Sequence, residues 1–262
     1  MTFDGSIAKN YDHYIVPFLF EPYAADLVSR VEITSDSNIL ELACGTGIVT
    51  QRLVSHLSGS AELTATDINA EMLAVAQEKI TASNVGWDTV DLAAIPYEQD
   101  LFDTVVCQFG LMFATDKARA VTEIHRVLKK GGKLLFNVWA PIADNPIWRI
   151  YTTLLARFFP NNMPNPAFGP FSMSDENYGL SLLQQTGFTH FMVESVSKTG
   201  ICDTASNAAI GFTLGLPLYN FIKNDPSLVK RFQDTLEEAI GQELGTNPVS
   251  SPLRSLVFTA EK

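Results

Sequence analysis

Short apolar runs alternate with amphipathic segments between residues 38 and 139. Apolar runs of this length are typical of buried strands, whereas apolar positions repeated every three or four residues are typical of helices. The pattern predicts strands at 38–42, 62–67, 85–92, 102–109 and 133–139, and helices at 48–57, 69–83 and 116–128. Strands and helices that alternate in this way form a mostly parallel sheet, whose carboxyl ends gather at one edge and bind ligands there.

The flanking segments have a different character. Residues 7–31 have helical spacing interrupted by Pro17 and Pro22, which predicts two short helices. Beyond residue 139, the pattern predicts helices at 147–159 and 175–186, a strand at 191–197, helices within 203–246 that break near Pro217 and Pro226, and a last strand at 255–260. We therefore expect a Rossmann-like, doubly wound, mostly parallel seven-stranded α/β sheet with a helical cap, formed by the N-terminal helices and an insertion before the last strand.

Composition narrows the class of ligand. The net charge is −11, and no run of basic residues is longer than the pair Lys129-Lys130, so nucleic acid is not expected as a partner. No secretory signal and no apolar stretch of about 20 residues is present, so we expect a cytoplasmic protein without a stable membrane anchor. Cys44, Cys107 and Cys202 form no metal-binding motif and are expected to be reduced thiols, with no metal in the site. The sequence leaves open whether the chain forms a homodimer.

The glycine-rich turn after the first strand carries the strongest chemical signal. Gly45 and Gly47 allow a sharp turn and a close approach of the backbone to a ligand, and Asp67 ends the next strand, where a carboxylate accepts hydrogen bonds from ribose hydroxyls. The alternative for Asp67 is a helix N-cap. A dinucleotide site would have a small residue where Thr50 stands, and Glu41 would repel a pyrophosphate but suit a cationic ligand.

The same segments resemble a known family. ILELACGTG, TATDINAEML, VDLAAIPYEQDLFDTVVCQFGLMF and DKARAVTEIHRVLKKGGKLLFNVW follow one another between residues 38 and 139 in the order and spacing of the class I S-adenosylmethionine-dependent methyltransferases. Within them, the chain is similar to the ubiquinone/menaquinone methyltransferase group, the methyltransferase type 11 proteins. The resemblance implies S-adenosylmethionine as cofactor, S-adenosylhomocysteine as product and methyl transfer to a small acceptor.

The resemblance also implies roles for individual residues. Gly45, Thr46 and Gly47 would bind the methionine part of the cofactor, Glu41 would face its amino group, and Asp67 would bind both ribose hydroxyls. The remaining cofactor contacts it implies are Ile68 and Met72 beside the adenine, Asp91 and the Leu92 amide at the adenine edge, Gln108 at the methionine end, and Tyr11 in the N-terminal segment. Helix packing is the alternative for Met72, and a plain strand-end acid is the alternative for Asp91.

By this reading, the chain is a single methyltransferase domain, 1–262, with a helical lid at 1–31, a cofactor-binding core at 38–139 and a helical cap insertion at 203–246. Segments 7–23 and 203–246 would together cover the cofactor and form the acceptor pocket, because the cofactor lies at the strand ends and must be closed off from water. His13 is the candidate general base, with a surface imidazole as the alternative.

The acceptor is expected to be small and aromatic or lipophilic. Aromatic residues are frequent after the fifth strand: Trp139, Trp148, Tyr151, Phe158, Phe159, Phe168, Phe171, Phe212, Tyr219 and Phe221. QFGL stands where amino-group methyltransferases of adenine or glutamine carry NPPY or DPPY, which argues against that chemistry. A cofactor-binding protein without turnover, or a nicotinamide-binding relative of the fold, is the alternative to an enzyme of this class.

Overall fold

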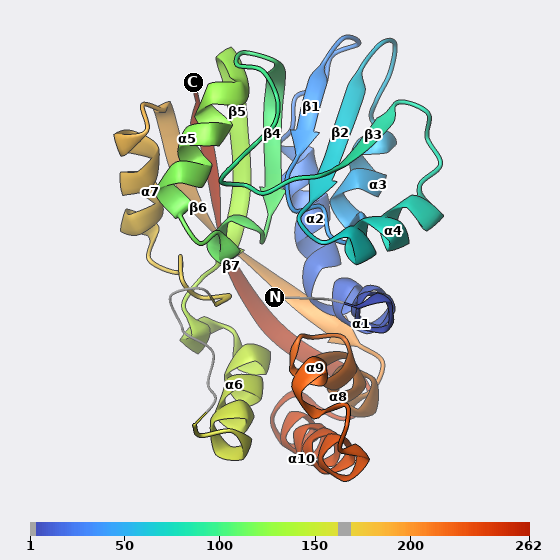
Figure 1. Ribbon diagram of the computed structural model, residues 1–262. Helices are drawn as coiled ribbons and strands as arrows, with labels where there is room; N and C mark the ends of the chain where they lie inside the picture. The colour runs from blue at the N-terminus through green and yellow to red at the C-terminus, as the bar shows by residue number, and fades with distance from the viewer. Residues whose placement is uncertain (1–3, 162–168) are drawn as a thin grey trace. The chain divides into compact units, whose positions relative to one another are not determined.

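The computed structural model describes residues 4–161 and 169–262, so Phe168 of the aromatic set lies outside the described residues. The alternating pattern folds into one seven-stranded sheet in the order β3-β2-β1-β4-β5-β7-β6 (Figure 1). The strands are β1 (Asn38–Glu41), β2 (Glu62–Asp67), β3 (Val85–Thr89), β4 (Phe102–Gln108), β5 (Leu128–Trp139), β6 (Thr189–Cys202) and β7 (Val249–Glu261). β1 to β5 pair in parallel, and β7 is antiparallel to β5, which confirms the mostly parallel Rossmann-like sheet.

The chain divides into two compact units. A sheet unit comprises 24–141, 165–196 and 255–262, and a helical unit comprises 1–23, 142–164 and 197–254. The chain crosses between the units several times, and both β6 and β7 contribute residues to each unit.

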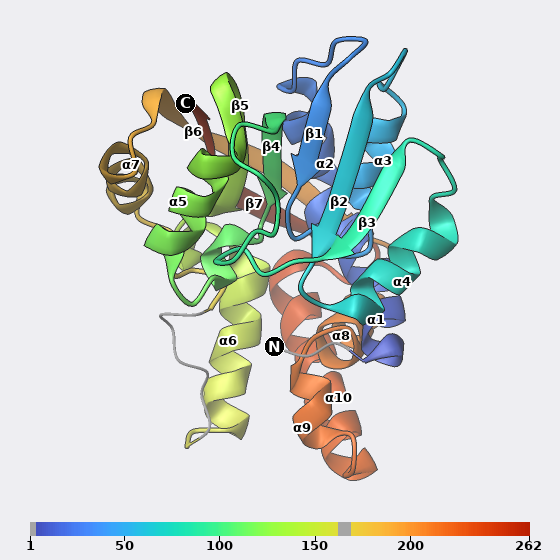
Figure 2. The same cartoon turned by 45° about the horizontal axis from the view of Figure 1, so that its top comes forward.

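Helices cover both faces of the sheet in the sheet unit. They are the larger part of α2 (Glu21–Ser29), α3 (Ile48–Val54), α4 (Ala70–Lys79), α5 (Lys117–Val127), α7 (Glu176–Gln185) and the short 3-10 helix η2 (Leu111–Phe113). In Figures 1 and 2, α5 lies in front of the sheet, and α2 and α3 lie behind it. The core behind the sheet is apolar and buried, with Leu27 of α2 and Leu53 of α3 packed among Ile39, Leu63 and Val106 of the strands.

The N-terminal segment differs from its prediction. Helix α1 (Gly5–Asn10), the π-helix η1 (Tyr11–Phe20) and α2 follow one another without a break, so the expectation of two helices separated at Pro17 and Pro22 is wrong. A proline ring clashes with the carbonyl four residues earlier in an α-helix, and the wider π turn accommodates it. The amide of Glu21 accordingly donates to the carbonyl of Val16, five residues back, and Pro22 lies in the first turn of α2.

The other helices of the helical unit follow the sequence pattern closely. They are η3 (Ile142–Asp144), α6 (Pro146–Phe158), α8 (Ala205–Leu214), α9 (Leu218–Ile222) and α10 (Pro226–Leu244), and the breaks near Pro217 and Pro226 are confirmed. α8 packs against η1, so the N-terminal segment and the insertion belong to the same unit. Gly211 permits this approach, since a Cβ at that position would lie 2.7 Å from Cβ of Tyr14. That these segments close over a cofactor stays a prediction.

The core of the helical unit is aromatic. Phe232 of α10 is fully buried and contacts the rings of Tyr151 and Phe158 of α6, with centroids 6.2 and 5.2 Å away. Phe212 of α8 lies 5.2 Å from Trp148 and is also fully buried. Much of the aromatic content that suggested an acceptor wall therefore forms the interior of this unit.

Candidate functional site

The glycine-rich turn joins β1 to α3 and is anchored to both neighbouring strands. The amide of Leu42 donates to the carbonyl of Val106 in β4, and the amide of Cys44 donates to the carbonyl of Thr66 in β2, each at 2.8 Å. Within the turn, Ala43, Gly45 and Gly47 have φ of 54°, 56° and 86°. Left-handed backbone is costly for alanine, and such strain is common where a chain is shaped around a ligand.

The two glycines of this turn have different reasons to lack a side chain. A Cβ on Gly47 would lie 2.9 Å from Cδ1 of Ile80 and 3.0 Å from Cβ of Ala76, so this glycine lets α3 pack against the end of α4. A Cβ on Gly45 would meet nothing within 4 Å. Gly45 therefore leaves its backbone open to a neighbouring molecule, as a binding turn requires.

Asp67 ends β2 beside this turn. Its Oδ2 accepts the amide hydrogen of Gly45 and its Oδ1 accepts that of Asn69, both at 2.8 Å. The N-cap of α4 is Asn69, whose side chain accepts from Glu71 and Met72, so the helix-cap interpretation of Asp67 is wrong. Each carboxylate oxygen can accept more than one hydrogen bond. Burial raises the pKa of Asp67, although these amide hydrogen bonds act to lower it.

Glu41 ends β1 and is almost completely buried, with 1% of its surface exposed. Its pKa is raised to about 8, chiefly by burial and to a smaller extent by the charge of Asp67, against the lowering effect of the hydroxyl and amide of Thr50 in the first turn of α3. Among the described residues, its Oε2 has no hydrogen-bond partner. A buried carboxylate with an uncommitted oxygen, beside a second acid, favours a ligand that carries positive charge or hydrogen-bond donors.

The strand order brings the predicted residues to one edge of the sheet. β3, β2, β1 and β4 are neighbours, so Asp91, Asp67, Glu41 and Gln108 follow one another along their carboxyl ends. The amide of Val90 donates to the carbonyl of Asp67, which holds the segment after β3 beside β2. This juxtaposition agrees with the sequence analysis, although the binding roles of these residues remain predictions.

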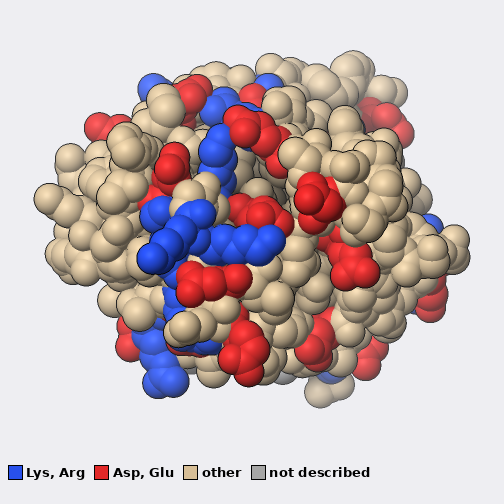
Figure 3. Space-filling view, turned by 90° about the horizontal axis from the view of Figure 1, so that it is seen from above, with Lys and Arg blue, Asp and Glu red and all other residues tan. Residues whose placement is uncertain are grey.

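Basic side chains gather at the other end of the strands. Figure 3 looks onto the amino-terminal ends of the parallel strands and shows basic and acidic side chains side by side. Three ion pairs lie there: Lys129–Asp103, Lys133–Glu32 and Lys262–Asp100. The carboxyl edge, by contrast, carries the acids Glu41, Asp67 and Asp91, and a cationic ligand bound there would favour the ionised form of Glu41 and Asp67.

The predicted adenine contacts differ in exposure. Ile68 follows Asp67 and is 65% exposed, so its side chain is accessible to a ligand. Met72 is buried, which agrees with the helix-packing alternative. Asp91 is exposed and accepts the amide hydrogen of Ala93 at 2.9 Å, and Leu92 beside it is half-buried.

Tyr11 and His13 belong to the π-helix η1 of the helical unit, whereas Glu41, Asp67 and Gln108 belong to the sheet unit. The ring of Tyr11 contacts Phe20 at 5.5 Å, and the exposed imidazole of His13 lies edge-on to Tyr14 at 4.5 Å. Their proposed roles, cofactor contact and general base, remain predictions.

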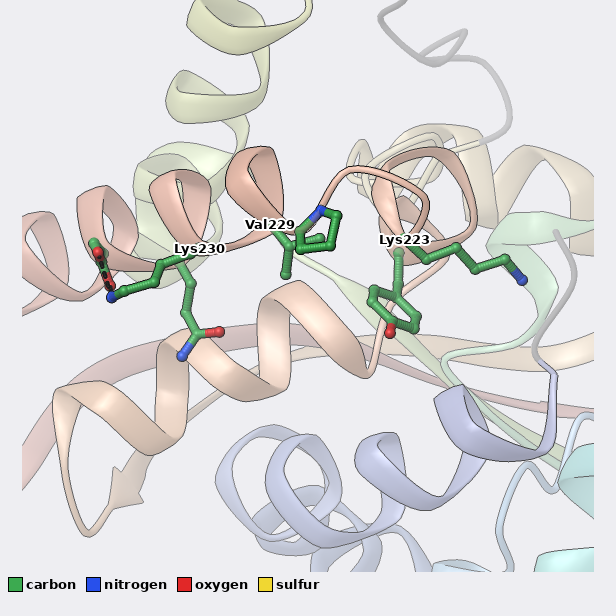
Figure 4. Close-up of a pocket in the computed structure, with 7 residues that line it drawn as sticks. Lys223, Val229 and Lys230 are labelled. Atoms are coloured by element: carbon green, nitrogen blue, oxygen red, sulfur yellow. Dashed lines mark hydrogen bonds and ion pairs between the residues drawn. The ribbon is translucent and has the colours of Figure 1, made fainter.

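A hollow of about 250 Å³ lies in the helical unit between α9 and α10 (Figure 4). Its lining includes Tyr219, Lys223 and Lys230. Lys223 is paired with Asp4 and Lys230 with Asp234, so the two ammonium groups are already neutralised by neighbouring acids. We assign this hollow no role. Among the described residues, no cluster of three metal-ligating side chains is present, and no helix has the length and apolar character of a membrane span.

Comparison with known proteins gives a consistent picture. A family model described as a methyltransferase domain matches residues 39–132. The demethylmenaquinone methyltransferase of Lactiplantibacillus plantarum is 33% identical over 165 residues, which cover 59% of this chain and 69% of that protein. The ubiquinone/menaquinone biosynthesis C-methyltransferase UbiE of Proteus mirabilis is 32% identical over 123 residues, which cover 45% of this chain and 49% of that protein. The chain thus spans about half the length of this UbiE relative.

Solved structures share the fold. The phosphoethanolamine N-methyltransferase 2 of Haemonchus contortus, in complex with S-adenosylmethionine, superimposes with a TM-score of 0.60 at 15% identity, over 97% of this chain and 56% of that one. The YcgJ protein of Bacillus subtilis has a TM-score of 0.60 at 17% identity, over 91% of this chain and 97% of that one.

Proposed function

Because the chain belongs to the class I S-adenosylmethionine-dependent methyltransferases, we propose that it transfers a methyl group to a ring carbon of an oxygen-substituted aromatic acceptor of the quinol type. The observation that carries the proposal is the similarity to relatives named demethylmenaquinone methyltransferase and ubiquinone/menaquinone biosynthesis C-methyltransferase. The alignment with the first of these relatives covers 165 residues, which is more than the segment 39–132 that matches the methyltransferase family model.

The sheet edge fits S-adenosylmethionine, the cofactor of this family. Its amino and sulfonium groups are cationic, and Glu41 offers a buried carboxylate oxygen without a partner. Its ribose hydroxyls are donors, and Asp67 offers acceptor capacity at the adjacent strand end. The open side of Gly45 leaves room for the backbone to approach the methionine part. When bound, the cofactor supplies an activated methyl group on its sulfonium.

The residues of this chain would contribute by binding and alignment. Displacement of a methyl group from a sulfonium needs nucleophile, carbon and sulfur in line, and such alignment contributes at most about 7–11 kcal/mol. A quinol acceptor becomes a carbon nucleophile when its ring hydroxyl loses a proton, so oxygen recognition and carbon reactivity are linked in this class of acceptor. The absence of an NPPY or DPPY sequence after β4 agrees with an acceptor that is not an amide or adenine amine.

Incubation with trideuteromethyl-labelled cofactor tests the proposal. The acceptors would be reduced naphthoquinone and, for comparison, phosphoethanolamine, both under exclusion of oxygen. We expect labelled product from the quinol only, and this product should reoxidise to a methylated quinone in air, which a methyl ether cannot do. Methylation of phosphoethanolamine alone, or formation only of the ether, would overturn the proposal.

A further inference from the structure

Asn137 is the one polar residue in LLFNVW, the last six residues of β5, and the sequence pattern assigned it no role. Its side chain is fully buried. The side-chain Oδ1 accepts the amide hydrogen of Phe109 at 3.1 Å, and the main-chain carbonyl of Asn137 accepts the same hydrogen at 3.0 Å. Because Phe109 can only donate here, the orientation of the Asn137 amide is fixed, with Oδ1 toward Phe109.

The other half of this amide is uncommitted. Within the part of the chain that the structure describes, Nδ2 of Asn137 is buried and has no hydrogen-bond partner. An unsatisfied buried donor lowers stability, and native proteins rarely keep one without a reason. Because an amide Nδ2 can only donate, its missing partner is a hydrogen-bond acceptor such as an oxygen.

The position of Asn137 links it to the sheet edge. It pairs in register with Gln108, the last residue of β4, and β4 lies next to β1. The loop that follows β4 approaches the glycine-rich turn, since a Cβ on Gly110 would lie 2.3 Å from Cβ of Ala43. Asn137 therefore extends the row of polar residues along the carboxyl ends by one strand, beyond the residues expected to bind the cofactor.

The backbone beside Asn137 is held in an unusual conformation. Phe109 has φ of 51°, which is rare for a bulky residue, and its ring stacks on Trp139 with centroids 4.2 Å apart. The two hydrogen bonds from Phe109 to Asn137 stabilise this arrangement. Strained backbone beside an unsatisfied polar group is typical of a binding site rather than of a passive core.

We propose that Nδ2 of Asn137, aligned by Phe109 at the carboxyl edge of the sheet, donates a hydrogen bond to a ring oxygen of the methyl acceptor. This inference rests on the proposed function for the identity of the acceptor as an oxygen-substituted aromatic. It makes Asn137 a specificity-determining residue, because an aromatic ring without an oxygen would leave the donor unsatisfied. The cationic groups of the cofactor cannot take this role, since they accept no hydrogen bond.

NMR of the wild-type protein tests the contact directly. The protein is prepared with isotope-labelled asparagine, saturated with S-adenosylhomocysteine, and titrated with naphthol or with naphthalene, which lacks the oxygen. The side-chain amide signal of Asn137 is identified by its absence in Asn137→Leu. We expect naphthol to shift this signal and naphthalene to leave it in place. No shift with naphthol would overturn the inference.

Affinity measurements separate the acceptor from the cofactor. Asn137→Leu keeps the number and branching of the side-chain heavy atoms, and the amide of Phe109 keeps its bond to the main-chain carbonyl. We expect about a tenfold loss of naphthol affinity, the scale of one hydrogen bond, with unchanged affinity for S-adenosylhomocysteine. The control Thr104→Val removes a buried hydroxyl near the opposite end of β4 and should change neither.

An equal loss of S-adenosylhomocysteine affinity in Asn137→Leu would show that the amide serves the cofactor carboxylate, and would overturn the inference. The methylation test and the NMR test can fail independently. If reduced naphthoquinone is not methylated but naphthol shifts the Asn137 signal, the quinol proposal fails and the oxygen-binding role of Asn137 stands.

Discussion

The carboxylate of Asp67 accepts the backbone amide hydrogen of Gly45, with 2.8 Å between Oδ2 and N. The end of β2 thereby stabilises the turn that follows β1, so a residue expected to bind ribose also shapes the loop expected to bind the methionine part. We therefore predict that binding of the ribose and binding of the methionine part both depend on the carboxylate of Asp67.

Replacing Asp67 by alanine should weaken S-adenosylmethionine binding by about 1.5–3 kcal/mol, the range for hydrogen bonds to a charged group. Calorimetric titration of the folded variant measures the loss. Asp175→Ala is the matched control, because Asp175 also accepts a backbone amide hydrogen, as the N-cap of α7. The control should lose stability, by about 0.5–2 kcal/mol, but no cofactor affinity. Unchanged affinity in Asp67→Ala would contradict the assignment.

Glu41 should make stability fall as the pH rises. Its pKa is about 8 in the folded protein and 4.5 as the unperturbed value, so between these limits the unfolded chain releases a proton that the folded protein keeps. The free energy of unfolding then decreases with pH, by at most about 1.4 kcal/mol per pH unit. Glu41→Gln removes this dependence, so the variant should gain stability relative to wild type near pH 8 and show no gain near pH 4.5. Denaturant unfolding at both pH values measures it, and an equal difference at both would contradict it.

Cofactor binding should release a proton from the same group. A cation beside Glu41 favours the ionised carboxylate, so affinity for S-adenosylmethionine should rise as the pH increases toward about 8. Calorimetry at neutral pH in two buffers with different ionisation enthalpies reports the released proton as a difference in apparent binding enthalpy. The difference should shrink in Glu41→Gln, and its persistence there would assign the proton to another group, such as Asp67.

Gly45 and Gly131 form a matched pair. Both have positive φ, at 56° and 74°, and a Cβ on either would meet nothing within 4 Å. Alanine at either position should therefore cost a similar roughly 1–2 kcal/mol of backbone strain. Only Gly45→Ala should also weaken S-adenosylhomocysteine binding, because its new methyl group would project into the space assigned to the ligand. Equal affinities in the two variants would show that this space is not used.

Phe232 should matter for stability rather than for acceptor choice. It is fully buried among the aromatic rings of α6, so Phe232→Ala should lower the free energy of unfolding by about 3–5 kcal/mol. Phe221 on α9 is 84% exposed, and Phe221→Ala should change stability by less than about 0.5 kcal/mol. Thermal or denaturant unfolding measures both. A Phe232→Ala variant that stays stable but prefers a different acceptor would show that this aromatic cluster contacts the acceptor.

The sheet unit could be predicted from the sequence in detail because local signals agree there. β2 begins at Glu62 and ends at Asp67 as predicted, because the alternation of apolar residues stops where the terminal acid stands. The helix predicted at 116–128 ends at Val127, and β5 begins at Leu128 rather than at the predicted Lys133. Leu128 pairs with Phe102 before a shift of register, a tertiary pairing that no local pattern encodes.

Other features depend on contacts between distant segments. β6 was predicted at 191–197 and spans Thr189–Cys202, and β7 was predicted at 255–260 and spans Val249–Glu261, because each strand continues into the helical unit. The π-helix around Pro17 has no periodic signal of its own. Asn137 was missed because a single polar residue in an apolar run is read as part of the strand, and only the hydrogen bonds of its side chain reveal an unmatched donor.

The place of β7 in the sheet also bears on how the chain is synthesised. β7 lies between β5 and β6, yet residues 203–248 are made after β6 and before β7. While the ribosome adds that stretch, the edge of β5 that later pairs with β7 is exposed, and β6 has no strand to pair with. Unpaired strands of this kind are prone to aggregate. Nascent chains should therefore depend on chaperones until β7 emerges, and sheet closure should be a late, long-range event in folding.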